Sequence, residues 1–245
     1  MVRSAGYKVG DKFTNFQGSE AVIVAYDTAR RVTLKFLDEY GFEVTVQANK
    51  LKIGRFKNPY APSVRGVGFI GVGKFAGSGR TYLRWKAMLD RCYSGLERHK
   101  AYSDCRVSTE WHNFQKFAEW FESNGGKNSW ATLDKDILVK GNRVYSDSTC
   151  CIVPNEINSL FISSPSSVQG LPSGVRINGS KYTSRVCTGK GTYINLGQFT
   201  CPEEAFQAYK KTKESRIKEM AVKFREVLSV PVFNNLLSWE VERTD

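Results

Sequence analysis

A glycine- and proline-rich segment at residues 55–81 divides the sequence into parts with different periodicities. Before it, residues 7–54 contain short β-branched and aromatic runs separated by turn residues. After it, apolar residues first recur at helical spacing and then return to short strand-like runs. Such a chain builds several small layered modules rather than one core of a single element type. The sequence predicts a multi-module α+β protein, with an SH3-like or Tudor-like β-barrel at 1–54 and a linker at 55–81.

Composition excludes several classes of protein. The chain is 41% hydrophobic and 13% aromatic, which indicates globular folding rather than disorder. No apolar stretch approaches the ~18 residues of a membrane span, and Met1–Gly10 lacks the apolar core of a signal peptide. The cysteines are irregularly spaced without a C-x-x-C pair, which indicates reduced thiols and no zinc site. We therefore expect a cytoplasmic protein without a membrane partner.

Positive charge is concentrated in one part of the chain. The formal net charge is +12, and residues 50–100 contain twelve Lys and Arg residues against two acidic ones. Concentrated cations release counterions from a nucleic-acid backbone, although a solvated basic face would look the same. If the charge serves binding, the candidate phosphate contacts in and just after the linker are Arg65, Lys74, Arg80, Arg84, Arg91 and Arg98.

Two helices and a hairpin are expected after the linker. Apolar stripes predict helices over Tyr82–Tyr93 and Thr109–Ser123. Strands at Thr132–Leu138 and Thr149–Val153 are expected to form a hairpin, followed by a helix from Pro154 to about residue 162.

Strand alternation places Asp134 and Asp136 on one face, with Lys135 on the opposite face. An acid on such a strand and Asn158 on the helix could hold one divalent cation and leave positions open for a scissile phosphate.

Short motifs follow in order along residues 82–162. They are Trp85-x-x-Met88-Leu89-x-Arg91-Cys92-Tyr93, Tyr102-Ser103-Asp104-Cys105-x-Val107, Trp111-x-x-Phe114-x-x-Phe117-x-x-Trp120, Leu133-Asp134-Lys135-Asp136-Ile137, Gly141-Asn142-x-x-Tyr145-Ser146-x-x-x-Cys150 and Pro154-x-x-Ile157-Asn158. This ordered set resembles the phage-borne HNH-type (His-Me finger) endonuclease-like proteins.

The resemblance implies an HNH-like ββα core at 82–165 and a hydrolase acting in a phage-infected bacterial cell. It further implies Mg²⁺ or another divalent cation, held by Asp134 or Asp136 with Asn158, and DNA contacts from Lys140 and Arg143.

The chain departs from the family at the general base. HNH nucleases use a strand histidine to activate water, but the only histidines here, His99 and His112, lie elsewhere. Lys135 or Asp136 stands where the histidine is expected. Either the nuclease works with an altered constellation, or the scaffold binds DNA without cutting it.

The last part of the chain predicts three short strands followed by a long helix. A capping box at Thr200–Glu203 starts the helix, which could run to Leu228. The motifs are Gly174-Val175-Arg176, Lys181-Tyr182-x-x-Arg185, Leu196-Gly197-x-Phe199 and Glu203-Glu204-Ala205-x-x-Ala208-Tyr209. They resemble the AP2 DNA-binding domain, here at residues 170–230, with a C-terminal tail at 231–245.

The AP2 resemblance implies that the three strands enter the major groove of double-stranded DNA. The residues carried over as DNA contacts are Arg176, Lys181, Tyr182 and Arg185. HNH-like and AP2-like modules occur together in phage homing endonucleases, so each resemblance supports the other. A small α+β dimerisation domain is the alternative for this part of the chain.

The leading hypothesis is therefore a metal-dependent DNA endonuclease or nickase targeted by the AP2-like module. The second is a catalytically inactive DNA-binding regulator or host-takeover factor on the same scaffold. The third is a protein that binds RNA or the ribosome.

Overall fold

The computed structural model describes residues 6–162, 170–189 and 192–244, and its described residues form a mixed α+β protein with several small sheets. The chain divides into two compact units, Met1–Glu119 and Trp120–Asp245. Within the described ranges, no helix is long and apolar enough to cross a membrane.

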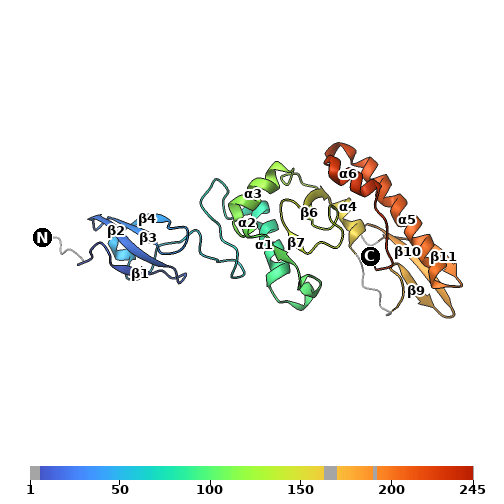
Figure 1. The fold of residues 1–245 in the computed structure, drawn as a ribbon, viewed down its shortest axis with the longest axis horizontal. Coiled ribbons are helices and arrows are strands. Elements are labelled where there is room, and N and C mark those ends of the chain that lie inside the picture. Colours follow the sequence, from blue (N-terminus) through green and yellow to red (C-terminus); the bar gives the residue numbers. More distant parts are fainter. Residues whose placement is uncertain (1–5, 163–169, 190–191, 245) are drawn as a thin grey trace. The chain divides into compact units, whose positions relative to one another are not determined.

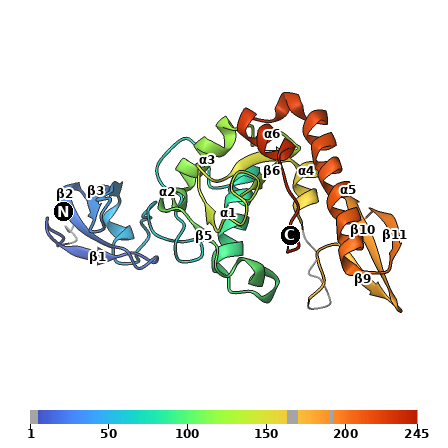
Figure 2. The same ribbon diagram turned by 45° about the vertical axis from the view of Figure 1, so that its right-hand side comes forward.

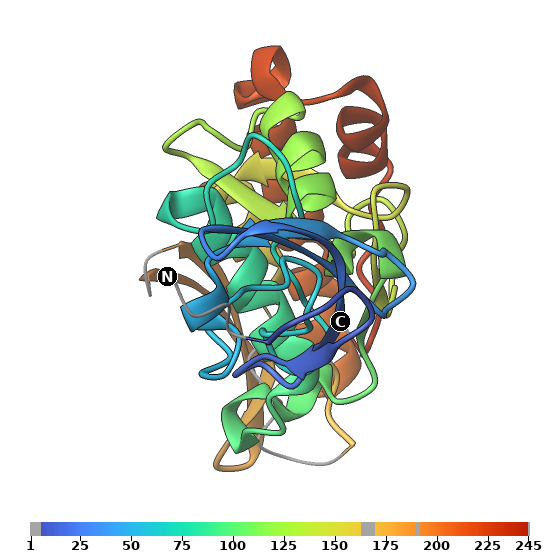
Figure 3. The same cartoon turned by 90° about the vertical axis from the view of Figure 1, so that its left-hand side faces the viewer.

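The first unit begins with an antiparallel sheet of order β1-β2-β3-β4 (Figures 1 and 3). Its strands are β1 (Lys12–Thr14), β2 (Glu20–Thr28), β3 (Arg31–Phe36) and β4 (Glu43–Val46). Alternate residues of β2 and β3, such as Ile23 and Leu34, are fully buried, as period-2 patterning requires. The predicted strands are confirmed.

The predicted closure of this sheet into a barrel is wrong for the described residues, where β1 and β4 are not paired. The edge strand β1 is only three residues long, too short to pair along both sides of a barrel wall. The one-turn 3₁₀ helix η1 (Ala48–Lys50), Leu51 and Phe56 cover the open end of the core instead.

Residues 55–78 are not a free linker, which corrects that prediction. The Phe69 amide donates to the carbonyl of His112 (2.9 Å), and the amide of Phe114 donates to the Phe69 carbonyl (2.9 Å). A Cβ on Gly68 would overlap the side chains of Trp85 and Leu89. Glycine is needed here because the backbone runs directly against a helix.

That helix is α1 (Gly79–Tyr93), which starts three residues before its predicted beginning. Trp85, Met88 and Leu89 are fully buried, so the predicted apolar stripe is confirmed. The 3₁₀ helix η2 (Glu97–Tyr102) and the short strand β5 (Arg106–Val107) follow α1.

The helix predicted over Thr109–Ser123 is interrupted, forming α2 (Thr109–His112) and α3 (Phe114–Ser123). Asn113 between them is extended, with ψ 113°, because its backbone lies beside Phe69 in a parallel bridge. The boundary between the two units falls inside α3.

The second unit starts with a two-stranded hairpin. Strand β6 (Ala131–Asp134) pairs antiparallel with β8 (Cys151–Pro154), and Asp134 lies opposite Cys151. The hairpin is confirmed, but its first strand ends at Asp134 rather than Leu138. The short strand β7 (Val144–Tyr145) lies in the connection. The following helix is shorter than predicted, with α4 (Asn155–Asn158) continuing as the 3₁₀ helix η3 (Ser159–Phe161).

The C-terminal sheet has the order β11-β10-β9 and is antiparallel. Its strands are β9 (Val175–Asn178), β10 (Lys181–Gly189) and β11 (Thr192–Phe199), which confirms the predicted strands. Helix α5 (Pro202–Lys223) lies along one face of the sheet (Figure 2).

Helix α5 differs from its prediction at both ends. Its N-cap is Cys201, whose sulfur accepts a hydrogen bond from the Glu204 amide, whereas Thr200 was part of the expected capping box. The helix ends at Lys223 rather than Leu228, because Phe224 leaves helical geometry before the 3₁₀ helix η4 (Arg225–Val227).

One hydrophobic core spans much of the second unit. Ile217 and Met220 of α5 pack with Val153 of β8, Ile157 of α4 and Leu236 of α6 (Val230–Leu237). The expected module boundaries, 82–165, 170–230 and 231–245, do not coincide with the division into two units. The hairpin, the long helix and the C-terminal helix instead share a core (Figure 1).

Candidate functional site

Two of the three residues expected to bind a metal, Asp134 and Asp136, lie at the end of β6 and just after it. Asp134 is 8% exposed, and its Oδ1 accepts hydrogen bonds from the backbone amides of Asp136 and Ile137, both at 2.8 Å. Burial raises the pKa of this carboxyl, and the two amide hydrogen bonds oppose that effect. Asp134 therefore closes the turn that ends the strand, as an aspartate in an Asx turn does.

Lys135 is buried beside this turn. Its Nζ donates to both carboxylate oxygens of Asp136 (2.7 and 2.9 Å) and to the backbone carbonyl of Asn142 (2.7 Å). The Asn142 amide group in turn donates to the carbonyls of Lys135 (2.9 Å) and Val144 (2.6 Å). The three contacts of Lys135 Nζ use all the hydrogens of its ammonium group. The expectation that Asp134 and Asp136 share a strand face, with Lys135 opposite, is wrong because the strand has already ended.

This donor set does not fit a divalent cation. One oxygen of Asp134 is already shared by two amides, and both oxygens of Asp136 contact an ammonium group. Asn158, half-buried at the end of α4, forms no hydrogen bond with either carboxylate in the described part of the chain. Over the described ranges, no group of three or more His, Cys, Asp and Glu residues could hold a metal ion.

The histidines have structural surroundings. His99 Nδ1 lies 2.8 Å from the Ser94 hydroxyl and 3.0 Å from the Asp90 carbonyl, beyond the end of α1. His112 lies against the Tyr93 ring, and burial lowers its pKa. Neither belongs to the cluster at Asp134.

The face of the β9–β11 sheet away from α5, here called the open face, collects the polar side chains. Tyr182, Ser184 and Val186 of β10 alternate toward the core beneath α5, so Thr183 and Arg185 point the other way. The register of the strands shows which residues of β9 and β11 lie beside these two on the open face. Arg176 and Gln198 flank Thr183, Asn195 pairs with Arg185, and Tyr193 pairs with Cys187.

The open face is positively charged. From Ile157 to Pro202 the sequence contains no Asp or Glu, while Arg176, Lys181 and Arg185 all belong to the sheet. The Arg185 guanidinium lies over the Tyr193 ring, 4.3 Å from its centroid. Such stacking restrains the arginine and leaves its planar group able to donate in two directions.

Tyr182, which the resemblance indicated as a DNA contact, does not lie on the open face. It is half-buried and packs against the core formed by Val175, Phe206 and Tyr209. Tyr193, Asn195 and Gln198 of β11 lie on the open face but were not among the residues that the resemblance indicated. The alternation of side chains along Thr192–Phe199 was the available signal for them.

In the first unit, a smaller group of basic residues lies on α1 and consists of Arg80, Arg84 and Arg91. Desolvation lowers the pKa of Arg84, and the positive charges of Arg80 and Arg91 lower it further, so these guanidinium groups lie near one another. Arg65 is paired with Asp90 at 2.5 Å, and Arg91 lies over the Tyr102 ring. Arg98 is exposed in η2, and Lys74 lies near the Phe75 ring.

Two other predicted contacts lie in the second unit. Lys140 pairs with Glu242 at 3.1 Å and donates to the Glu240 carbonyl, so it holds the C-terminal segment. Arg143 is exposed just before β7. Neither belongs to the open face.

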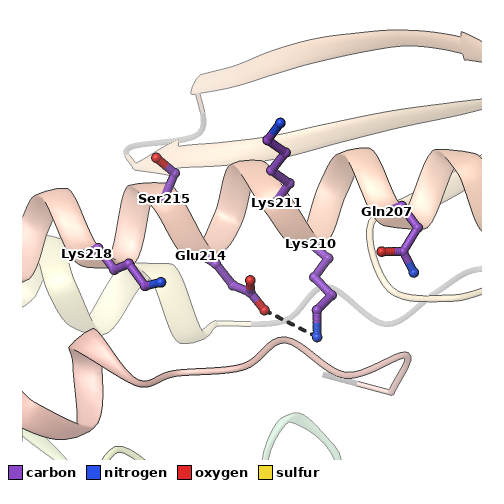
Figure 4. A pocket seen from close by; sticks show the side chains of 6 residues that line it. All are labelled: Gln207, Lys210, Lys211, Glu214, Ser215 and Lys218. Carbon is purple, nitrogen blue, oxygen red and sulfur yellow. Dashed lines mark ion pairs between the residues drawn. The ribbon is translucent and has the colours of Figure 1, made fainter.

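A pocket also lies along α5 (Figure 4). Its Glu214 is ion-paired with Lys210 and accepts from the Val241 amide (2.8 Å), so this part of it fastens the C-terminal segment. The lining residues are Gln207, Lys210, Lys211, Glu214, Ser215 and Lys218.

No protein-family model, curated protein or solved structure matches this chain.

Proposed function

We propose that this protein binds double-stranded DNA through the open face of the β9–β11 sheet. The observation that carries the proposal is the composition of that face. It presents Arg176, Arg185 and Lys181 with Asn195 and Gln198, and no carboxylate lies in any of its strands. Helix α5 covers the other face, where its Phe206 and Tyr209 pack in one core with Val175 and Val186 of the sheet.

A sheet of this kind suits the major groove, which admits β-strands as readers of base edges. Arginine forks recognise guanine, and asparagine or glutamine amides recognise adenine. Arg176 and Gln198 lie on either side of Thr183, so both could reach neighbouring base pairs. Lys181, at the start of β10, is suited to a phosphate.

The test compares Arg176→Ala and Arg185→Ala with the unchanged chain. A duplex enriched from a random pool and a scrambled duplex serve as probes in fluorescence anisotropy. Each arginine contributes about 1–3 kcal/mol of base discrimination, so we expect each variant to lose about tenfold or more of its preference.

The matched control is the double variant R30A/R31A, which removes charge from the exposed turn after β2 and from the exposed first residue of β3. It should retain the preference for the enriched duplex. Equal losses in control and test variants would contradict the assignment of the open face. Tighter binding of an RNA hairpin than of any duplex would favour the RNA alternative.

We further propose that the chain acts as a DNA-binding regulator rather than as a nuclease. Asp134 and Asp136 already satisfy backbone amides and a lysine, so they are poorly suited to carry a metal ion and a scissile phosphate. Supercoiled plasmid incubated with Mg²⁺ or Mn²⁺ should stay intact. Nicking that disappears in a D134A/D136A variant would instead support the endonuclease.

A further inference from the structure

A pocket of about 380 Å³ lies in the first unit, between the turn after β3 and residues 58–62. Its volume lies within the range of pockets that bind small groups. The lining residues are Ser19, Glu20, Leu37, Asp38, Glu39, Tyr40, Asn58, Tyr60, Ala61 and Pro62. Neither the α1 arginines nor the open face contributes to it.

Aromatic rings form one wall of the pocket. Tyr40 stacks on Tyr60 with ring centroids 4.2 Å apart and an interplanar angle of 8°. Phe69 supports both rings, with centroids 5.4 Å from Tyr40 and 5.7 Å from Tyr60. Tyr40 is 45% exposed, so a rigid aromatic surface remains accessible to a ligand.

Carboxylates supply the charge of the pocket. Glu20, Asp38 and Glu39 line it, and among the described residues none of the three forms an ion pair. The pKa of Tyr40 is raised by desolvation and then by the negative charges of Glu39 and Asp38. This negative potential stands out in a chain whose net charge is +12.

A buried asparagine fixes the two sides of the pocket. Asn58 is 3% exposed and donates through Nδ2 to Asp38 Oδ2 (2.5 Å) and to the Ser19 hydroxyl (3.3 Å). Its Oδ1 accepts from the Tyr60 amide (2.9 Å). These hydrogen bonds preorganise the pocket. The groups that donate to Asp38 are backbone and side-chain amides, which are neutral, so they leave the charge of its carboxylate uncompensated.

We propose that this pocket binds the positively charged side chain of a lysine or arginine in a basic segment of a partner protein. Aromatic faces attract cations, and uncompensated carboxylates strengthen that attraction. The same carboxylates repel a phosphate backbone, so this pocket and the open face favour ligands of opposite charge.

The experiment uses the full ¹⁵N-labelled chain and two short peptides of otherwise neutral residues. One peptide has a central arginine and the other has citrulline, which keeps the shape without the charge. We expect the arginine peptide to shift the amide signals of Tyr40 and Gly41, and to bind about tenfold or more tightly than the citrulline peptide.

Two variants locate the binding. E20Q/E39Q removes pocket charge and Tyr40→Leu removes the aromatic wall, and each should weaken arginine-peptide binding about tenfold. The control E97Q/E226Q removes the same charge from exposed positions outside the pocket and should leave binding unchanged.

No binding of the arginine peptide at millimolar concentration would overturn the proposal, as would equal binding of both peptides or equal weakening by the control. Circular dichroism of each variant checks that it is folded. Duplex DNA binding by E20Q/E39Q should be unchanged, which separates this inference from the proposed function.

Discussion

Lys135 or Asp136 stands where the resemblance to HNH-type nucleases would place a general base, and Lys135 carries an ammonium group. The sequence expectation put this residue on a strand, facing away from two acids. In the structure Asp134 turns the chain at the strand end, and Lys135 joins Asp136 to the Asn142 carbonyl. An ammonium group held by hydrogen-bond acceptors stabilises its loop rather than taking a proton from water.

Replacing Lys135 by methionine tests this stabilising role. The variant keeps the buried stem but leaves the Asn142 carbonyl and the half-exposed Asp136 carboxylate without their donor. We expect the free energy of unfolding to fall by about 2 kcal/mol in urea denaturation. Lys100→Met, which breaks an exposed pair with Glu97, should change it by less than about 0.5 kcal/mol. Equal effects would contradict the role.

The neighbouring thiols give a second prediction at this scale. Burial raises the pKa of Cys150 to about 12, and that of Cys151 is raised as well. Both thiols should resist iodoacetamide at pH 8 until urea opens the fold, while half-buried Cys187 and Cys201 react sooner. Mass spectrometry of the labelled peptides measures the order of reaction.

The same burial sets a pH dependence. Because the folded chain holds the Cys150 proton more tightly than the unfolded chain does, this contribution to stability is complete below the ordinary thiol pKa. It is lost as the pH rises from there toward about 12. Cys150→Val should flatten the stability profile in that interval. An unchanged profile would show that other groups dominate it.

At the scale of elements, the junction of β9 with α5 shows how closely a strand and a helix can approach. Gly174 has φ +76°, and a Cβ there would overlap the Tyr209 ring. Tyr209 also accepts a hydrogen bond from buried Lys213, one turn further along α5. Gly174 therefore meets two requirements for glycine at once, because its backbone has positive φ and it lies directly against the Tyr209 ring.

Gly174→Ala should lower the free energy of unfolding by about 3 kcal/mol, combining overpacking with left-handed backbone strain. Gly179→Ala is the matched control. Gly179 also has positive φ, but nothing lies within 4 Å of an added Cβ. The control should cost about 1 kcal/mol, from backbone strain alone. Chemical denaturation of both variants separates the two contributions, and equal losses would contradict the packing argument.

At the scale of the whole molecule, the basic side chains that give the net positive charge have different surroundings. Part of it is tied to structure, as in the pairs Arg65–Asp90 and Lys140–Glu242. Arg80 and Arg84 on α1 are exposed cations close enough to affect each other. Repelling guanidinium groups of this kind are relieved by a polyanion, which gives affinity without base preference.

The double variant R80A/R84A should therefore weaken binding to all duplexes alike. Each lost phosphate contact reduces the slope of log affinity against log salt by about 0.9, so we expect a change of up to about 2. Anisotropy titrations over a series of salt concentrations measure that slope. A change in preference between enriched and scrambled duplexes, with the slope unaltered, would contradict this role.

Local pattern determined most of the secondary structure. Alternation was sufficient for β2, β3 and β10, and helical spacing was sufficient for the stripe of Trp85, Met88 and Leu89, because both periodicities depend on near neighbours. The same alternation could have located Tyr193, Asn195 and Gln198 on the open face. The amino-acid sequence alone also shows that β9–β11 contain basic residues and no acidic ones.

Only the tertiary structure decided whether the first sheet closes, how residues 55–78 pack, and what Asp134 and Lys135 contact. Asn113 is extended because distant Phe69 pairs with it, and the Lys135 ammonium is directed by a carbonyl beyond the turn. The pocket at Tyr40 exists because Asn58 joins it to Ser19 and Asp38. The contacts of Asn113 and of Asn58 join residues far apart in the chain, so their cost in chain entropy and their gain in packing cannot be read from a local stretch of sequence. The contacts of Asp134 and Lys135 lie within about eight residues, but they depend on where the strand ends and on how the following loop folds.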